Sequence, residues 1–386
     1  MSGTEEVGAG TTGRIGVGVI GAGVISNEYL GNLTTFPDLE VRFVADIDEP
    51  RAAAQAEKYG VPASGSVAQL LADDGIEIVV NLTIPKVHVD VALQVLAAGK
   101  HVWSEKPFAL DREEGRRLLD AAHAAGLRAA TAPDTFLGAG IQSSRRLVES
   151  GAIGTPLTAL TLMQSPGPES WHPNPDFLFQ EGAGPLFDIG PYYLTALVQL
   201  FGPIARVTAT ASKAKAVRTI GSGPRAGEQF QVTVPTHVGA LYEFESGQSA
   251  QSIFSFDSKL ARTQFEVAGV DGTLVVPDPN TFTGDLLIHR GPSPTKTGGT
   301  GTGETETIAA TGTTTTRGTG VVELAQAIRA GRPERASAEQ AFHVLDVMVS
   351  TIESAQAHQS VEVTSTVVVA PPLDEHWDPR VGTFDA

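Results

Sequence analysis

Cysteine is absent from all 386 residues of the chain. This absence excludes a disulfide framework, a thiolate zinc or iron–sulfur site and a cysteine nucleophile. Basic residues are also scarce, since 27 lysines and arginines stand against 44 aspartates and glutamates, for a net charge of −17. A chain this acidic, with no local basic patch, repels phosphate backbones and anionic lipid, so we expect neither nucleic acid nor a membrane surface as a partner.

The chain also lacks any stretch near the ~20 consecutive apolar residues that a membrane-spanning helix needs. Its N-terminus carries the acidic pair Glu5-Glu6 where a signal peptide would carry lysines, and no apolar core follows. We therefore expect a cytoplasmic protein whose residues 1–13 form a disordered tail. A hydrophobic content of 41% at this length predicts a globular chain of two or three domains.

Strand-like and helix-like segments alternate through the first half of the chain. The run Arg14–Ile20 is apolar after its first residue, as a buried parallel strand should be. Such alternation forms βαβ units, which predicts an α/β domain over residues 14–135 with a parallel sheet and helices on both faces. Further strands are expected at 40–45, 77–82, 101–104 and 127–131, and helices at 50–59, 66–72, 88–98 and 113–125.

Residues 136–386 follow a different pattern, with β-rich runs whose short spacings favour antiparallel neighbours in an open sheet. We expect an α+β domain packed on the first. Its strands are expected at 157–163, 205–211, 237–244, 249–256, 264–268 and 273–276, and its helices at 140–150, 184–201, 321–330 and 338–358.

Glycine and threonine dominate the segment Gly291–Gly320. Such a composition buries little surface, which predicts a long mobile loop. The loop could act as a lid over an active site or serve only as an exposed linker.

The turn Gly21-Ala22-Gly23 follows the first expected strand and opens a helix. In a dinucleotide site the first glycine permits a tight turn, the second lets the backbone approach a pyrophosphate, and the phosphates lie against helix N–H groups. The third small position holds Ser26, which can still pack against the strand. This context predicts nucleotide binding through Gly21, Gly23, Val24 and Ile25.

Asp46 ends the second strand, where a carboxylate can accept hydrogen bonds from the adenosine ribose. A carboxylate there repels a 2′-phosphate and the nearest arginine is Arg51, so NAD is favoured over NADP. The alternative is a helix cap, a role that Asp48 could equally fill.

Glu105-Lys106-Pro107 follows the strand at 101–104, at the carboxyl edge where open α/β sheets bind ligands. Lys106, beside a carboxylate and a stiffening proline, is well placed to hydrogen-bond a reacting hydroxyl. A solvated lysine in a βα loop is the alternative.

Asp188 and Tyr192 lie four residues apart at the start of the apolar helix, which places both on one face if the helix runs through them. A buried acid beside a phenol is costly without a partner, so the pair indicates function. If the helix begins only at Pro191, Asp188 lies in the preceding loop and the two need not face the same way. Tyr193 is expected in the core.

The loop Trp171-His172-Pro173-Asn174-Pro175 is polar, aromatic and stiffened by proline. Trp171 could stack on the C–H face of a sugar, and His172 could act as an acid or base. The alternative is an ordinary turn with the tryptophan buried. His88, near Pro85 at a helix start, is expected to be structural or to lie beside the cofactor.

Together these features resemble the glucose–fructose oxidoreductase / inositol dehydrogenase family of NAD(P)-dependent sugar and polyol dehydrogenases. The resemblance covers about residues 14–290. It rests on Gly21–Gly23, Val44-Ala45-Asp46, the segment from Thr83-Ile84-Pro85 to His88, Ala98–Val102 leading into Glu105-Lys106-Pro107, Val148–Gly154 and Asp188-Ile189-Gly190.

The resemblance implies a Rossmann domain joined to a domain with a large, mainly antiparallel sheet, through which such proteins often form homo-oligomers, here a dimer or tetramer. It implies that Lys106 and an Asp…His pair act on the substrate hydroxyl. Asp188 matches that aspartate, but Tyr192 stands at the histidine position. The expected cofactor contacts also include Thr83, Pro85, His88, Glu105 and Lys106, and the expected substrate contacts include Asp134, Trp171 and His172.

We expect Lys106 to lower the pKa of the Tyr192 phenol from its ordinary ~10, so that Tyr192 takes the hydroxyl proton while Asp188 orients the pair. His172 is the rival base. The expected activity is NAD-dependent oxidation of a ring hydroxyl of a neutral sugar, glycoside or polyol, or reduction of the matching ketone.

Two other functions stay open. One is an enzyme that keeps its NAD bound and uses transient oxidation for elimination or glycoside cleavage. The other is an NAD-binding regulatory protein whose catalytic residues have drifted. No metal site is expected for any of these functions.

Overall fold

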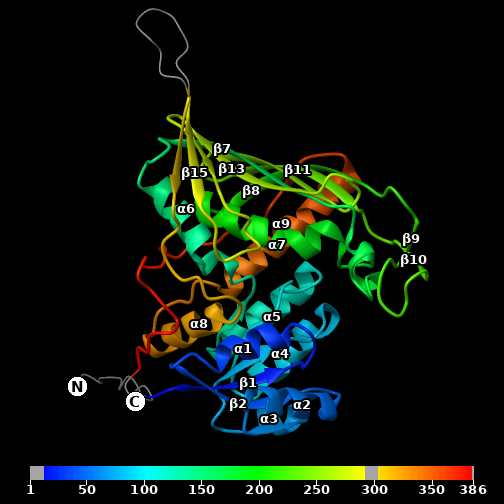
Figure 1. The fold of residues 1–386 in the computed structure, drawn as a ribbon, viewed down its shortest axis with the longest axis vertical. Coiled ribbons are helices and arrows are strands. Elements are labelled where there is room, and N and C mark those ends of the chain that lie inside the picture. Colours follow the sequence, from blue (N-terminus) through cyan, green and yellow to red (C-terminus); the bar gives the residue numbers. More distant parts are fainter. Residues whose placement is uncertain (1–12, 292–302, 385–386) are drawn as a thin grey trace, which may run out of the picture.

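The computed structural model describes residues 13–291 and 303–384. Figure 1 shows two sheets, one in the lower and one in the upper part of the molecule, with helices α5, α7 and α9 between them. The expected tail over residues 1–13 lies almost wholly outside the described residues. None of the helices in the described ranges is long and apolar enough to cross a membrane.

The lower sheet has six parallel strands in the order β3-β2-β1-β4-β5-β6, the doubly wound order of dinucleotide-binding folds. Helices α1, α2, α3 and α4 lie around its strands (Figure 1). The predicted α/β class is confirmed. The strands are β1 (Ile15–Ile20), β2 (Leu39–Ala45), β3 (Ala63–Gly65), β4 (Ile78–Asn81), β5 (His101–Ser104) and β6 (Ala129–Thr131). The helices are α1 (Ser26–Leu33), α2 (Glu49–Tyr59), α3 (Val67–Leu71), α4 (His88–Ala97) and α5 (Arg112–Ala125).

Side-chain caps and left-handed glycines fix the ends of these helices. Asp48 accepts a hydrogen bond from the backbone of Arg51 at the start of α2, and Gly60 ends it with a φ of 68°. Asp111 and Gly126 do the same for α5. A cap oxygen satisfies an N–H group that the helix leaves unpaired, and glycine adopts a positive φ at no steric cost, so these sequence signals predicted the helix bounds closely.

The upper sheet has nine strands in the order β16-β15-β14-β13-β7-β12-β11-β8-β17, and all neighbours are antiparallel except β12 and β7. One face packs on α6 (Ala139–Glu149), α7 (Gly184–Phe201) and α9 (Ala338–Ala357), while no helix of the described residues covers the other (Figure 1). The large, mainly antiparallel sheet is confirmed. Its strands are β7 (Pro156–Gln164), β8 (Ile204–Ser212), β11 (His237–Phe244), β12 (Ser249–Ser255), β13 (Arg262–Gly269), β14 (Thr273–Val275), β15 (Leu286–Arg290), β16 (Glu304–Ile308) and β17 (Val361–Glu362). A small separate hairpin pairs β9 (Val217–Thr219) with β10 (Gln229–Gln231).

The segment predicted as a mobile loop over 291–320 is structured where it is described. Residues 292–302 lie outside the described part, but β16 pairs along its whole length with β15, and the chain then runs down to α8 (Thr319–Arg329). Composition misled here because threonine is a good strand former once a neighbouring strand supplies hydrogen bonds.

Helix α8 returns the chain to the lower domain, where Figure 1 shows it beside α1. Arg329 donates two hydrogen bonds to Glu77, at 2.6 and 2.7 Å, and Gln326 donates to Asp38 at 2.9 Å. We propose that the two domains divide near residue 135. Helix α8 comes from the later part of the chain but packs on the first domain.

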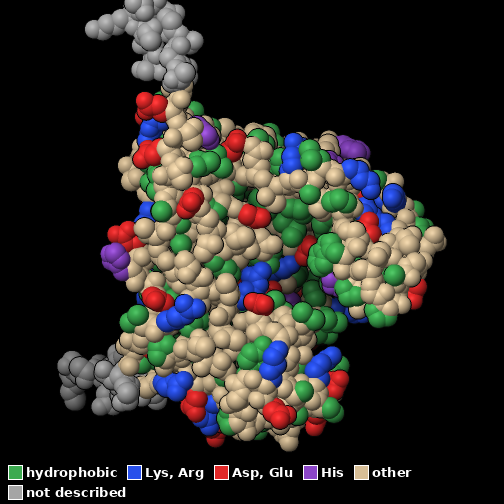
Figure 2. All heavy atoms as spheres, in the orientation of Figure 1, with side chains coloured by type: hydrophobic (Ala, Val, Ile, Leu, Met, Phe, Trp, Pro, Cys, Tyr) green, Lys and Arg blue, Asp and Glu red, His purple; other side chains and the backbone are tan. Residues whose placement is uncertain are grey.

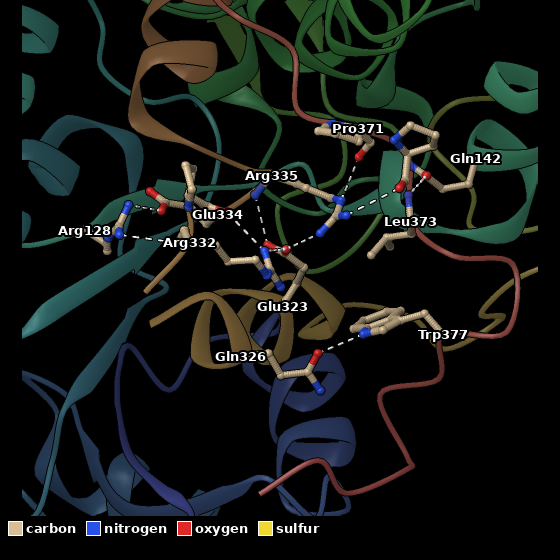
Figure 3. Close-up of polar contacts among 12 residues, drawn as sticks. Arg128, Gln142, Glu323, Gln326, Arg332, Glu334, Arg335, Pro371, Leu373 and Trp377 are labelled. Atoms are coloured by element: carbon tan, nitrogen blue, oxygen red, sulfur yellow. Dashed lines mark hydrogen bonds and ion pairs between the residues drawn. The ribbon is translucent and has the colours of Figure 1, made fainter. Parts of the chain in front are cut away.

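A buried carboxylate on α8 ties this helix to the chain that leads into α9 (Figure 3). Glu323 is 1% exposed and accepts hydrogen bonds from Arg332 at 2.6 Å and from Arg335 at 2.7 Å. Arg335 also donates to the carbonyl of Pro371 in the C-terminal segment. Because a buried charge is stable only when paired, this network fixes the connection between α8 and α9 against that segment.

We expect Gly320→Val to destabilise the protein by about 1–3 kcal/mol, because overpacking strains a full core. A Cβ at Gly320 would overlap the fully buried Trp103 indole. The matched control is Gly31→Ala in α1, whose Cβ would meet only an ordinary contact with Tyr59. Alanine favours a helix over glycine by up to ~1 kcal/mol, so this control should keep or raise the thermal midpoint. An unchanged midpoint in Gly320→Val would contradict the packing described.

Candidate active site

The carboxyl ends of β1, β2, β4 and β5 meet at one edge of the lower sheet, and the predicted cofactor residues gather there. Gly21 has a φ of 105°, and a Cβ on it would lie 2.7 Å from the carbonyl oxygen of Leu82. Only glycine fits that position. A Cβ on Gly23 would meet nothing within 4 Å, so the backbone there faces open space.

The start of α1 is able to receive an anion. Its N-cap residue, Ile25, provides no side-chain cap, and within the described chain the N–H groups of Val24 and Ile25 donate no hydrogen bond. Free N–H groups at a helix N-terminus bind phosphate. Three apolar side chains protrude around this edge, Val24, Ile47 and Ile84, which are 91%, 98% and 66% exposed. The residues present therefore fit a dinucleotide: the free N–H groups suit its phosphates, and the apolar side chains suit the faces of its rings.

Asp46 lies at the end of β2, 6% exposed. One carboxylate oxygen accepts from the Ala22 N–H at 2.7 Å, and the other from the Asp48 N–H and the Arg51 guanidinium. Burial alone would raise its pKa, but the hydrogen bonds from Arg51, Ala22 and Asp48 hold it below its ordinary value. The carboxylate is therefore ionised and held at the end of β2, where the sequence predicts a contact with the adenosine ribose. Asp48 caps α2, the role that sequence left open for either residue.

Lys106 reaches from the loop after β5 to α7 in the upper domain. Helix α7 begins at Gly184 and continues through Pro191, so the alternative start at Pro191 is wrong. The Lys106 ammonium donates to both the backbone carbonyl and the carboxylate of Asp188, at 2.7 and 2.8 Å. It is 17% exposed, so the alternative of a solvated lysine is also wrong.

The ion pair keeps Lys106 charged. Burial by itself lowers the lysine pKa, but the neighbouring Asp188 carboxylate outweighs burial and raises it above its ordinary value. A fixed ammonium donates hydrogen bonds and accepts none. Lys106 can therefore hold and polarise an oxygen atom but cannot take a proton from it.

Tyr192 lies beside Lys106, with the ammonium 5.4 Å from its ring centroid. Lys106 does favour the phenolate, as expected, but burial has the larger effect, and the pKa of Tyr192 is raised rather than lowered. The expectation of a lowered pKa is wrong because the ring is only 5% exposed, which sequence spacing could not show. Tyr192 is a phenol at neutral pH. Tyr193 is in the core as expected, beside Phe254 and Phe265.

A second cation, Arg317, also contacts Tyr192, and sequence reasoning missed it. Its Nη2 donates to the Tyr192 oxygen at 3.2 Å. Arg317 comes from the segment between β16 and α8, the one predicted as a mobile loop. Its single sequence signal is its place as the last charged residue before the start of a helix.

Glu105 and His88 are both buried. Glu105 accepts from the Tyr29 hydroxyl at 2.9 Å and from the Lys106 N–H at 3.0 Å. His88 is 1% exposed, and its two ring nitrogens face the carbonyls of Pro107 and Thr83. Both residues shape the loops that carry Lys106 and Thr83.

Asp134, expected among the substrate contacts, is fully buried. One carboxylate oxygen accepts from the N–H groups of Gly318 and Gly320, at 2.9 and 3.1 Å, and holds the start of α8. The other has no hydrogen-bond partner within the described chain and lies 3.9 Å from Arg317. Burial raises the pKa of Asp134 to about 6, although Arg317 and the two glycine N–H groups oppose the rise.

Trp171 and His172 lie on the loop between β7 and α7. Trp171 is 68% exposed, so the alternative of a buried tryptophan is wrong. His172 packs edge-on between Trp171 and Phe177, with centroid distances of 5.5 and 5.6 Å. Its Nδ1 accepts from the Asn174 N–H. The hydrogen of the neutral ring is therefore on Nε2.

Figure 2 shows a hollow between the lower domain and the lobe that carries β9 and β10, lined in part by basic and acidic side chains. Within residues 13–291 and 303–384, no group of three or more histidines and carboxylates could hold a metal ion.

Known proteins share this architecture. Residues 15–132 match an oxidoreductase family with an NAD-binding Rossmann fold, and residues 141–275 match the GFO/IDH/MocA C-terminal domain. The chain belongs to the GFO/IDH/MocA oxidoreductase family. The resemblance to that family is thereby confirmed, as are the NAD-binding Rossmann domain and its NAD cofactor, and the protein is an NAD(P)-dependent oxidoreductase.

Several named proteins are similar to the chain in sequence. A 1,5-anhydro-D-fructose reductase of Ensifer adhaerens is 28% identical over 264 residues, which cover 67% of this chain and 74% of that protein. An inositol 2-dehydrogenase of Saccharopolyspora erythraea is 34% identical over 161 residues, 40% of this chain and 47% of that one. A trans-1,2-dihydrobenzene-1,2-diol dehydrogenase of Mus musculus is 28% identical over 263 residues, 66% and 72% of the two chains.

Solved structures show the same fold. A levoglucosan dehydrogenase in complex with NADH and L-sorbose has a TM-score of 0.77 at 21% identity, over 92% of this chain and all of that one. An NAD-binding oxidoreductase from Klebsiella pneumoniae has a TM-score of 0.76 at 23% identity, over 91% of this chain and all of that one.

We expect Asp134→Asn to remove part of the pH dependence of stability. Because the folded pKa of Asp134 is about 6, against an ordinary 3.8, its contribution to the free energy of unfolding falls as pH rises from about 4 to 6. The full difference is on the order of 3 kcal/mol. The asparagine oxygen can still accept from both glycines. Urea unfolding across this range checks the prediction, and identical pH dependence in the two proteins would contradict it.

Proposed function

We propose that this GFO/IDH/MocA protein interconverts a hydroxyl and a ketone on a neutral sugar, glycoside or polyol ring. The observation that supports this most is the meeting of Lys106, Asp188 and Tyr192 above the carboxyl edge of the NAD-binding sheet. Bound NAD supplies the hydride acceptor, and NADH the hydride donor. The relatives named above act on an anhydrosugar, an inositol and a cyclic diol, which also supports a ring substrate.

Lys106 binds the reacting oxygen in this proposal. Its ammonium is charged at neutral pH and is fixed by two hydrogen bonds to Asp188, so it presents its remaining hydrogen in one direction. A hydrogen bond from an ammonium stabilises the negative charge that develops on a hydroxyl oxygen as its proton leaves. Asp188 positions Lys106 and keeps it charged.

Tyr192 exchanges the proton with that oxygen. It is a phenol at neutral pH because burial raises its pKa, so it is poised to donate a proton to the oxygen of a ketone. In the oxidising direction the phenolate must form first, and Lys106 favours it. We therefore expect ketone reduction to dominate at neutral pH and alcohol oxidation to rise as the solution becomes alkaline.

His172 is less suited to this role than the sequence suggested. Its Nδ1 is occupied by the Asn174 N–H, which leaves the neutral ring only an N–H donor at Nε2. We propose instead that Trp171, His172 and Phe177 bind the substrate at a distance from the reacting carbon. Exposed aromatic rings stack well on the C–H faces of sugars, and two salt bridges from Arg225 to Asp176 and Glu228 brace this loop.

We expect Tyr192→Phe to lower kcat by about 10²–10⁴-fold, as the loss of a general acid does. The measurement is NADH absorbance with a panel of neutral sugars, inositols and their ketones. The matched control is Tyr193→Phe, the neighbouring phenol that faces the core, which should keep its turnover. Turnover retained in Tyr192→Phe but lost in His172→Gln would assign the proton to His172 instead.

The same assay separates the alternatives. Net NADH formation from any substrate in the panel supports a dehydrogenase. Product formed on tightly bound NAD without net NADH would instead support elimination or glycoside cleavage. NAD binding with no turnover across the panel would support a regulatory protein.

We also propose that two copies of the chain associate through the uncovered face of the nine-stranded sheet. Leu160 on β7 and Leu241 on β11 are 37% and 38% exposed there, and each lies opposite Gln251 on the strand between them. A regular sheet face with exposed leucines suits a second copy.

We expect the double variant Leu160→Glu with Leu241→Glu to sediment as a monomer, because facing carboxylates would repel each other. The control is Val368→Glu, which adds one charge at a 95% exposed position in the C-terminal segment and should sediment like the unaltered protein. An unaltered protein that is itself monomeric would contradict the proposal.

A further inference from the structure

Two cations lie against the Tyr192 ring, and only one of them belongs to the predicted site. The Lys106 ammonium is 5.4 Å from the ring centroid, and the Arg317 guanidinium carbon is 5.7 Å from it. Arg317 Nη2 also donates to the phenol oxygen at 3.2 Å, and it lies 3.4 Å from Asn280 Oδ1. Arg317 is 18% exposed, so the contact is largely shielded from solvent.

The chain on both sides of Arg317 is hydrogen-bonded to the lower domain. Asn32 on α1 donates to the carbonyl of Arg317 and to the hydroxyl of Thr316, both at 2.8 Å. On the other side, the Gly318 N–H is held by Asp134 at 2.9 Å. An arginine loses about 2 kcal/mol of side-chain entropy when it is fixed, and a fixed backbone reduces the additional cost of ordering its tip.

The donors around Tyr192 decide where its own hydrogen points. A guanidinium and an ammonium only donate hydrogen bonds, so neither can accept from the phenol. Arg317 occupies one lone pair of the phenol oxygen. The phenol hydrogen must therefore point away from Arg317, toward an acceptor that is neither Arg317 nor Lys106.

We propose that Arg317 is a positioning residue for Tyr192, which turns the phenol hydrogen toward the substrate oxygen and stabilises the phenolate left after proton transfer. The inference rests on the proposed function in one respect, the role of Tyr192 in moving a proton. The step itself is balanced: the O–H bond of Tyr192 breaks, an O–H bond forms at the substrate oxygen, and the negative charge left on the phenol faces two fixed cations.

The charges that face Tyr192 act in opposite directions. Lys106 and Arg317 lower its pKa, whereas burial, Glu105 and Asp188 raise it. Asp134 lies behind the guanidinium, 3.9 Å from Nη1. Removal of Arg317 takes away one of the two groups that favour the phenolate, so the phenol should become harder to ionise.

The direct test is a pH titration of tyrosinate absorbance without substrate or cofactor. The signal of Tyr192 is the difference between a protein and the same protein carrying Tyr192→Phe. We expect Arg317→Gln to move this ionisation to higher pH by about 1–3 units, the size of effect that a charge at this distance has. Arg317→Lys, which keeps the charge, should move it less.

Arg329→Gln is the matched control, because it removes a guanidinium from α8 that pairs with Glu77 instead. It should leave the Tyr192 titration unchanged. Equal titrations in the unaltered protein and in Arg317→Gln would overturn the proposal, and so would an equal shift in Arg329→Gln. A fall in thermal midpoint with no shift in titration would assign Arg317 a structural role alone.

Turnover gives a second readout. With a substrate in hand, the pH at which oxidation reaches half its maximal kcat should rise in Arg317→Gln, with little change in KM. A shifted titration in a protein that turns over no substrate would keep the Arg317–Tyr192 coupling and reject the proposed function. The two proposals therefore fail separately.

Discussion

The ion pair between Lys106 and Asp188 joins the two domains at the point where chemistry is proposed. Neither charge would be stable alone at this depth, so each domain supplies the partner that the other needs. Because the lysine comes from a βα loop of the lower sheet and the aspartate from a helix under the upper sheet, the domains must be correctly placed for the pair to form. The same contact brings Tyr192, one turn further along α7, over the carboxyl edge of the NAD-binding sheet.

Local sequence signals were sufficient for most of the fold. Alternating strands and helices, aspartate caps and terminal glycines each act over a few residues, and the structure places the corresponding elements close to their expected bounds. The same holds for the cofactor edge. The strain at Gly21 and the place of Asp46 at the end of β2 follow from the strand–turn–helix context, which is written in consecutive residues.

Features that depend on distant packing could not be predicted in this way. Arg317 meets Tyr192 across 125 positions of sequence, and its segment looked unstructured because threonine and glycine carry little hydrophobic signal. The pKa of Tyr192 shows the same limit. Sequence suggested the cation that lowers it, but burial decides the direction of the shift, and burial is a property of the finished tertiary structure.

The C-terminal segment has a consequence for motion. After α9 the chain passes back along the molecule, and Thr383 and Phe384 bond to Asp38 at the start of β2, next to the helix α8 that has already returned there. The chain therefore connects the two domains at several places and not through a single hinge. A large opening of one domain away from the other would have to break several of these contacts at once. Ligand exchange should therefore proceed through small movements of surface loops, with the two domains nearly fixed.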